Sequence, residues 1–254
     1  MFSFRSLYFD DPPAVGRAVD IFPPDGPEQD IAVFFIHGGG WTAGSRAGMH
    51  CLMRECGRRG HESATTDYRL VPGSLFNQIE DVRTGLRLFM DDLSFRGKTC
   101  RMLLHGSSAG GHLALMAALL PWEDRDDLRK HIVGVAVQAP ALTFEPWPDI
   151  LPQAWQAMQN AVGASYGEAP ELFVQASPLR HIHPAMPPVL IMNAQYEEMF
   201  PLDLTEEFQR QARAVGGRVT IKQYPRAEHG FLYSLDRWQQ RQAFEDMMEF
   251  AQSL

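Results

Sequence analysis

The chain has 254 residues, 45% of them hydrophobic, and a formal net charge of −8 at pH 7. These values suit a soluble globular protein with a sizeable core, and the lack of a lysine- and arginine-rich cluster argues against a nucleic-acid partner. Because no apolar run is long enough to cross a bilayer, we expect no stable membrane insertion. The first residues do not resemble a signal peptide and the three cysteines suggest no disulfide framework, so we expect a cytoplasmic protein with reduced thiols.

Strands and helices are expected to alternate from the first part of the chain onward. We predict strands at residues 18–22, 31–36 and 62–66, and helices at 47–59 and 76–93. Residues 31–36 form a continuous apolar run, as in a strand buried on both faces. Ile79, Val82 and Leu86 recur at helical spacing, which predicts the second helix.

The alternation continues to the end of the chain. We predict strands at 101–104, 132–137, 189–192 and 218–224, and helices at 111–120, 204–215 and 237–250. This pattern indicates one α/β domain over residues 1–254, with a mostly parallel central sheet and helices on both faces.

Residues 141–188 fit the alternation poorly, because they form a long connection rich in proline, tryptophan and methionine. We interpret them as a lid or an irregular insertion. Trp147 and Trp155 in this segment, together with Trp41, are candidate substrate-binding residues. The alternative for Trp147 and Trp155 is that they only pack an irregular connection.

The motif Gly106-Ser107-Ser108-Ala109-Gly110 lies between a predicted strand and a predicted helix. This context is typical of a nucleophile elbow, a tight turn that presents a serine above the sheet. Glycine is needed beside such a turn because the neighbouring backbone comes too close for a Cβ atom. Ser108 is therefore the candidate nucleophile.

A second motif, His37-Gly38-Gly39-Gly40-Trp41, follows the strand predicted at 31–36. A glycine run at the end of a buried strand lets backbone N–H groups approach a substrate closely and stabilise an oxyanion. We expect the donors to be Gly38, Gly39 and Ala109, the residue after the nucleophile. The alternative is a plain glycine-rich turn.

A serine nucleophile needs a histidine as general base. His229 follows the strand predicted at 218–224 and lies on a loop at the strand's carboxyl end, so it is the preferred base. His181 and His183 are spaced like a metal pair, but a third ligand is missing and we interpret them as part of a surface turn. We predict neither a metal nor a cofactor.

Three carboxylates follow the strand predicted at 189–192 and compete for the role of the triad acid. We choose Glu197. Asp203, with Glu206 three residues later, resembles a helix N-cap and capping box, and Glu198 is expected to be exposed.

The motifs together resemble those of the α/β-hydrolases, in the hormone-sensitive-lipase-like and acetyl-esterase branch that includes BD-FAE and kynurenine formamidase-like proteins. The resemblance spans nearly the whole chain and implies the same nucleophile, oxyanion donors and base. It also implies that Asp67 and Asp81 brace the site. The chain departs from the family at the acid, where Asn193-Ala194 replaces the usual His-Gly pair and Glu197 replaces aspartate. The N-terminal cap of larger members is expected to be reduced or absent, because little precedes residue 18.

The leading hypothesis is a serine hydrolase that cleaves short-chain carboxylic esters through an acyl-enzyme. Alternatives are an arylformamidase and a feruloyl or acetylxylan esterase. A further alternative, from another class, is a hydrolase-like binding protein without activity. The expected partner is a small-molecule ester or formamide. The oligomeric state stays open, with a homodimer as one option.

Overall fold

A central sheet organises the computed structural model, which describes residues 4–10, 16–121 and 129–254. The eight strands of this described part have the order β1-β2-β4-β3-β5-β6-β7-β8. They are β1 (Arg5–Tyr8), β2 (Ala18–Phe22), β3 (Ile31–Ile36), β4 (Ser63–Thr66), β5 (Arg101–Ser107), β6 (Ile132–Gln138), β7 (Val189–Tyr196) and β8 (Val219–Glu228). β2 pairs antiparallel with β1 and β4, whereas the pairs from β4 across to β8 are parallel.

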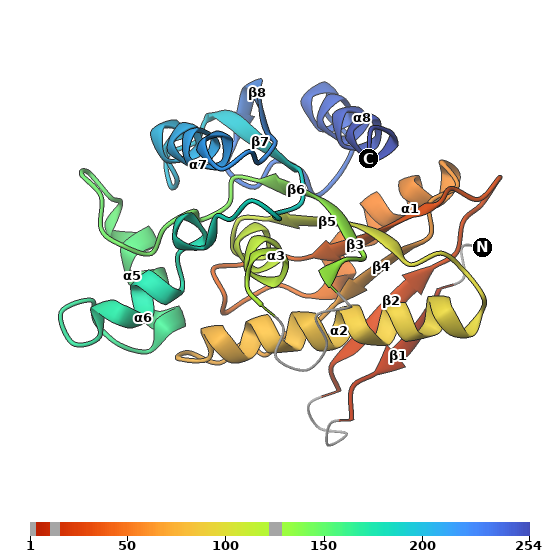
Figure 1. Cartoon of the computed structure of the whole chain (residues 1–254), viewed down its shortest axis with the longest axis horizontal. Coiled ribbons are helices and arrows are strands. Elements are labelled where there is room, and N and C mark those ends of the chain that lie inside the picture. Colours follow the sequence, from red (N-terminus) through yellow and green to blue (C-terminus); the bar gives the residue numbers. More distant parts are fainter. Residues whose placement is uncertain (1–3, 11–15, 122–128) are drawn as a thin grey trace.

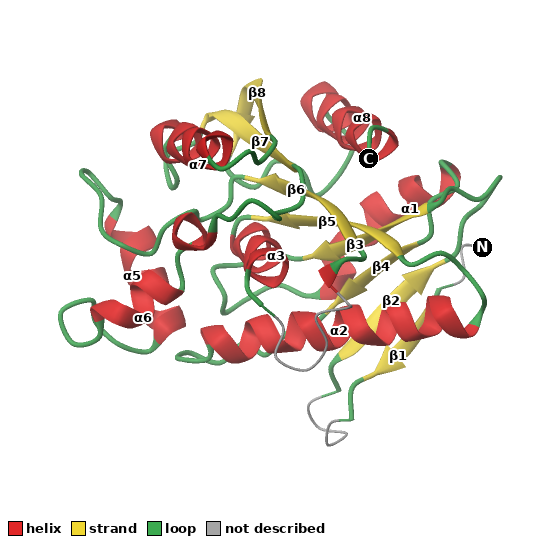
Figure 2. Ribbon diagram, viewed as in Figure 1, coloured by secondary structure: helices red, strands yellow, loops and turns green. Residues whose placement is uncertain are grey.

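Helices cover both faces of the sheet, as Figures 1 and 2 show. One face carries α1 (His50–Arg58), preceded by the 3-10 turn η1 (Arg46–Met49), and α8 (Trp238–Gln252). The opposite face carries α2 (Leu75–Phe95), α3 (Ala109–Leu119) and α7 (Leu202–Ala214). Parallel strands require this double cover, because each crossover connection places a helix on a face of the sheet.

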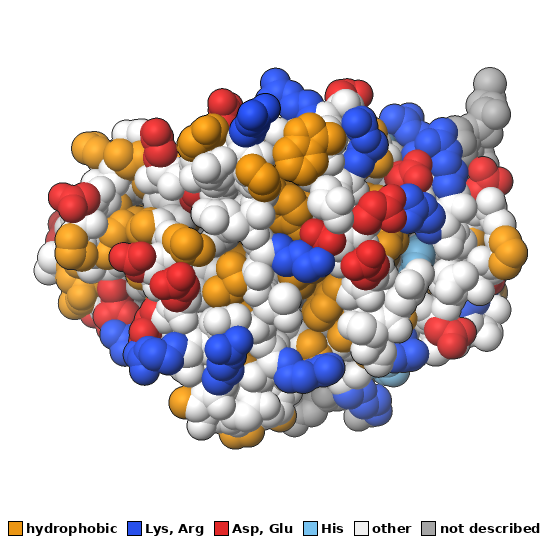
Figure 3. All heavy atoms as spheres, turned by 90° about the horizontal axis from the view of Figure 1, so that it is seen from above, with side chains coloured by type: hydrophobic (Ala, Val, Ile, Leu, Met, Phe, Trp, Pro, Cys, Tyr) orange, Lys and Arg blue, Asp and Glu red, His pale blue; other side chains and the backbone are white. Residues whose placement is uncertain are grey.

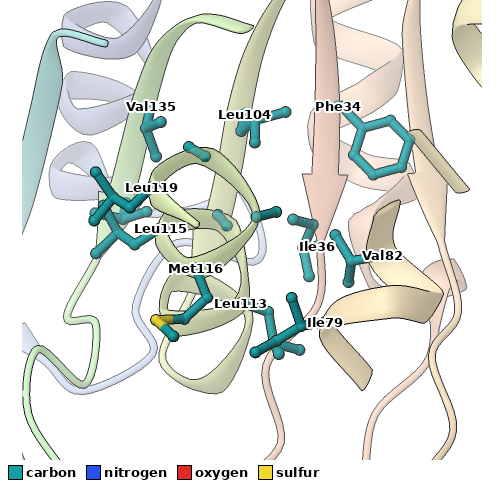
Figure 4. Close-up of a cluster of buried hydrophobic side chains, with 14 of the residues drawn as sticks. Phe34, Ile36, Ile79, Val82, Leu104, Leu113, Leu115, Met116, Leu119 and Val135 are labelled. Carbon is teal, nitrogen blue, oxygen red and sulfur yellow. The ribbon is translucent and has the colours of Figure 1, made fainter. Parts of the chain in front are cut away.

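Alternating side chains of the buried strands fill two separate cores. In β3, Phe34 and Ile36 belong to the core under α2 and α3, whereas Val33 and Phe35 belong to the core under α1 and α8. Every side chain of α3 is buried, as expected of a helix that is apolar all round. Figure 4 shows α3 enclosed between the sheet, represented by Leu104 and Val135, and α2, represented by Ile79 and Val82. The helix behind the elbow is therefore held on several sides.

β8 lies at one edge of the sheet and carries charged side chains. Figure 3, which looks onto this end of the molecule, shows basic and acidic side chains interspersed. Lys222 of β8 pairs with Asp246 of α8, and Arg210 pairs with Glu207 on α7. Charges along an edge strand discourage pairing with the edge of another sheet.

The mostly parallel sheet with helices on both faces confirms the expected fold class. Residues 141–188, interpreted as a lid or an irregular insertion, contain two helices that were not expected, α5 (Pro152–Val162) and α6 (Pro170–Gln175), and the 3-10 turn η2 (Pro178–His181), joined by irregular connections. The expected N-cap at Asp203 was wrong: α7 begins at Leu202 with Pro201 as its N-cap. The strand β1 was not expected from the sequence.

Candidate active site

Ser108 occupies a strained turn between β5 and α3. Its backbone angles are φ 55° and ψ −120°, a region that costs a non-glycine residue roughly 1–3 kcal/mol. A Cβ atom at Gly110 would lie 2.2 Å from the carbonyl oxygen of Ile36, and one at Gly106 would lie 2.2 Å from that of Gly110. The N–H of Ser108 donates to the carbonyl oxygen of Gln138 at 2.8 Å. The two glycines and the bond to β6 therefore hold the serine in its unusual conformation.

His229 lies just beyond the end of β8 and faces Ser108. Its Nε2 atom is 2.8 Å from the Ser108 Oγ atom, and its Nδ1 atom is 2.8 and 2.9 Å from the two carboxylate oxygens of Glu197. A carboxylate only accepts hydrogen bonds, so Nδ1 carries the ring hydrogen and Nε2 is left to accept the serine proton. The hydroxyl, the imidazole and the carboxylate form one hydrogen-bonded line.

Glu197 is held from two sides on the turn after β7. Its side chain is 5% exposed, and Oε1 also accepts hydrogen bonds from the N–H groups of Met199 (3.0 Å) and Phe200 (3.2 Å). The other two candidate acids, Glu198 and Asp203, are exposed. The structure therefore brings Glu197, and neither alternative, to the histidine.

The glycine loop after β3 differs in one respect from the expected oxyanion hole. The N–H of Gly38 donates to the hydroxyl of Tyr233 at 2.8 Å, so in this arrangement it is engaged. The N–H groups of Gly39, Gly40 and Ala109 meet no acceptor in the described part of the chain. Gly39 and Gly40 have φ values of 125° and 58°, which turn the backbone around the cavity and favour glycine. The candidate oxyanion donors are therefore the N–H groups of Gly39, Gly40 and Ala109. Gly40 was not expected from the sequence, and it takes the place of the expected Gly38.

A cavity of about 440 Å³ opens beside Ser108 and His229. The glycine loop, with Gly44, Ser45 and Gly48, forms one wall, and Ala154 and Ala157 of α5 form another. Met199, Phe200 and Tyr233 complete the lining, and none of the lining residues in the described part of the chain is a lysine, arginine, aspartate or glutamate. Sequence reasoning missed these wall residues, although Tyr233 stands only four positions after His229.

The three candidate tryptophans lie in different places. Trp41 lines the cavity but is only 2% exposed, and its indole N–H donates to Nδ1 of the buried His112 at 3.3 Å. Trp147 packs against Phe200, with ring centroids 6.4 Å apart, and Trp155 packs against Phe173 at 5.6 Å. Neither Trp147 nor Trp155 lines the cavity. The alternative reading therefore holds for both: Trp147 packs against the turn after β7, and Trp155 of α5 packs against α6.

Polar residues around the site act as braces. Asp67 accepts a hydrogen bond from the backbone N–H of Arg46 at 3.1 Å, and both oxygens of Asp81 pair with the guanidinium of Arg69. Asn193, at the departure from the family pattern, donates to the hydroxyl of Thr205 on α7 at 3.1 Å. These contacts fix the loop after β4 relative to η1 and α2, and β7 relative to α7.

His37 at the start of the glycine loop is buried and stacks on Tyr68, with ring centroids 4.3 Å apart. Burial lowers the pKa of His37 and keeps its ring neutral. Its Nδ1 atom lies 2.8 Å from the carbonyl oxygen of Gly38, so the ring hydrogen on Nδ1 donates to that oxygen. This histidine therefore shapes the loop and is no second base.

The described residues contain neither a metal centre nor a membrane-spanning helix. Within residues 4–10, 16–121 and 129–254, no three histidine, cysteine, aspartate or glutamate side chains are grouped to hold a metal ion. Cys51, Cys56 and Cys100 are free thiols. Among the helices that the structure describes, none has both the length and the apolar character needed to cross a membrane.

Curated proteins with related sequences are named as esterases. The chain is 27% identical to esterase LipC of Mycobacterium tuberculosis over 89% of its length, and 24% identical to the isoprenylcysteine alpha-carbonyl methylesterase ICME of Arabidopsis thaliana over 96%. It covers 59% of LipC and 61% of ICME. The chain thus spans less than two thirds of these relatives.

Solved structures with the same fold include esterase 2 of Thermogutta terrifontis. The form phosphonylated by sarin superposes with a TM-score of 0.83 at 20% identity, covering 99% of this chain and 95% of that one. The propionate-bound form gives a TM-score of 0.76 at 21% identity, covering 98% and 92%. The profile of the BD-FAE family matches residues 19–211. The chain belongs to the BD-FAE family of α/β-hydrolases.

Proposed function

We propose that this protein hydrolyses short-chain carboxylic esters, with Ser108 as nucleophile, His229 as general base and Glu197 as the acid that orients the histidine. The observation that carries the proposal is the unbroken line of hydrogen bonds from the Ser108 hydroxyl through the imidazole to the Glu197 carboxylate. The names of the curated relatives, and a structural neighbour described as phosphonylated by sarin, support the same class of reaction.

In the first half of the reaction, Ser108 Oγ attacks the ester carbonyl while its proton passes to Nε2 of His229. Negative charge develops on the carbonyl oxygen, which we propose is stabilised by hydrogen bonds from the N–H groups of Gly39, Gly40 and Ala109. When the tetrahedral intermediate collapses, the C–O bond to the alcohol breaks and His229 returns the proton to the leaving oxygen.

In the second half, a water molecule replaces the alcohol. His229 takes one of its protons, and the resulting hydroxide attacks the acyl-enzyme carbonyl. Collapse releases the carboxylic acid, and the proton returns to Ser108 Oγ. Glu197 stabilises the imidazolium in both halves through the hydrogen bond at Nδ1.

The lining of the cavity supports small, uncharged substrates. It offers alanine, methionine and aromatic side chains and no ionised group to pair with a charged acyl or alcohol part. Burying an unpaired charge there would cost several kcal/mol, as an order of magnitude. Residues 141–188 contribute the α5 wall, and we propose that this segment acts as the lid of the site.

The proposal is tested with p-nitrophenyl esters from acetate to decanoate and with a fluorophosphonate probe. We expect hydrolysis of the shorter esters and covalent labelling of the wild-type protein. Ser108→Ala should abolish labelling and lower kcat by about 10⁴–10⁶-fold, whereas Ser107→Ala should keep the label. A folded wild-type protein that hydrolyses none of these esters and takes up no probe would refute the proposal.

A further inference from the structure

Two tyrosine hydroxyls hold opposite ends of one peptide unit at the start of the glycine loop. The hydroxyl of Tyr68 donates to the carbonyl oxygen of His37 at 2.9 Å. The N–H of Gly38, which belongs to the same peptide bond, donates to the hydroxyl of Tyr233 at 2.8 Å. The plane of the His37–Gly38 peptide is therefore fixed on both sides.

The contact between Tyr233 and Gly38 joins two loops that are far apart in the sequence. Tyr233 lies on the loop from β8 to α8 that also carries His229, and Gly38 follows β3. A Cβ atom at residue 38 would lie 2.4 Å from the Tyr233 oxygen and 2.5 Å from the carbonyl oxygen of Ser107. The hydroxyl reaches the peptide N–H because residue 38 is glycine.

The Tyr233 hydroxyl also lies beside the nucleophile elbow, because a Cβ atom at residue 38 would touch both it and the carbonyl oxygen of Ser107. The tyrosine hydroxyl contacts the hydroxyl of Ser107, the residue before the nucleophile. The Ser107 hydroxyl itself donates to Oε1 of Gln138 at 2.5 Å, so its single hydrogen is used there. Burial raises the pKa of the Tyr233 phenol, so the hydroxyl that binds Gly38 stays protonated.

We infer that Tyr233 is a positioning residue that sets the oxyanion loop for catalysis by fixing the His37–Gly38 peptide from the histidine loop. Its hydroxyl accepts the hydrogen bond of the Gly38 N–H, so it acts on the reaction through the loop. The N–H groups of Gly39 and Gly40 follow this peptide along the chain, so fixing its plane limits the directions in which they can point. The inference rests on the proposed ester hydrolysis and adds a residue to it.

The test compares Tyr233→Phe with Tyr8→Phe, a matched control at an exposed position on β1. Rates with p-nitrophenyl butyrate are expressed per site titrated with the fluorophosphonate, so that unfolded protein does not count. We expect Tyr233→Phe to lower kcat about 10-fold with KM changed less than about 3-fold, because the loss falls on the transition state. The inhibition constant of a trifluoromethyl ketone, which forms a tetrahedral adduct on serine, should rise by the same factor.

Tyr68→Phe supplies a second variant if Tyr233→Phe does not fold, because it frees the other end of the same peptide and should give the same pattern. Values of kcat and inhibition constant equal to those of Tyr8→Phe would overturn the inference while leaving ester hydrolysis intact. A higher kcat in Tyr233→Phe would also overturn it, since Gly38 would then act better as a free donor. A wild-type protein without hydrolysis or labelling would instead refute the proposed function itself, and this inference with it.

Discussion

Nδ1 of His229 lies 2.8 and 2.9 Å from the two carboxylate oxygens of Glu197, so the imidazole hydrogen is shared between them. Glu197→Gln keeps the shape of the side chain but introduces an NH₂ group that can stabilise the wrong tautomer of the histidine. We expect kcat for p-nitrophenyl butyrate to fall about 10²–10⁴-fold. Glu198→Gln and Asp203→Asn are the matched controls and should retain wild-type kcat; loss of turnover in one of them, and not in Glu197→Gln, would assign the acid elsewhere.

The small residues of α5 set the width of the cavity. Ala157 lines it, whereas Gln153 on the same helix is exposed. Ala157→Leu adds three carbon atoms to the wall, so we expect kcat/KM for p-nitrophenyl octanoate to fall about 10-fold more than that for the acetate. Gln153→Leu should leave the ratio between the two esters unchanged. An unchanged ratio in Ala157→Leu would mean that the acyl chain lies along another wall.

Gly110 is the point at which the elbow approaches β3 most closely. Gly110→Ala would place a methyl group 2.2 Å from the carbonyl oxygen of Ile36, and the backbone must shift to relieve the clash. We expect the free energy of unfolding, measured in urea, to fall by at least about 2 kcal/mol. Gly167→Ala, where the added atom meets nothing within 4 Å, is the control. Equal stability of the two variants would show that the elbow is looser than described.

The buried His105 of β5 makes stability depend on pH. Burial lowers its pKa from 6.5 to about 4, so between these values the unfolded chain binds a proton that the folded protein does not. The free energy of unfolding should therefore fall as the pH drops from about 6.5 to 4, with this residue contributing about 3 kcal/mol as an order of magnitude. His105→Leu should flatten the profile in urea titrations at pH 4.5 and 7.5. A slope equal to that of the wild type would contradict this assignment.

Most strands could be predicted because buried parallel strands are short continuous apolar runs, as at residues 31–36. The helices of residues 141–188 were missed because their prolines suggested an irregular connection. Pro152 and Pro170 instead stand at the first position of α5 and α6, where the missing N–H leaves no bond unmade. The spacing of Ala154, Met158 and Ala161, all buried in α5, was the helical signal available.

In the candidate site, Ser108 and His229 were predictable because each lies in a local motif at the end of a strand. The bond between Gly38 and Tyr233 was not, since it joins residues 195 positions apart and depends on how two loops meet across the sheet. Glu197 could be predicted only in part. Its position after β7 limited the choice to three carboxylates, and only the folded turn places one of them beside the histidine.

The turn from Glu197 to Phe200 ties chemistry to substrate selection. The carboxylate that orients the base also binds the N–H groups of Met199 and Phe200, whose side chains form part of the cavity wall. A change of side chain at position 199 can alter the accepted acids and alcohols while the backbone bonds to Glu197 stay in place, whereas Phe200 also packs against the ring of His229. Insertions or deletions in this turn would disturb chemistry and substrate selection at once, so the substrate range can evolve by substitution here and not by a change in loop length.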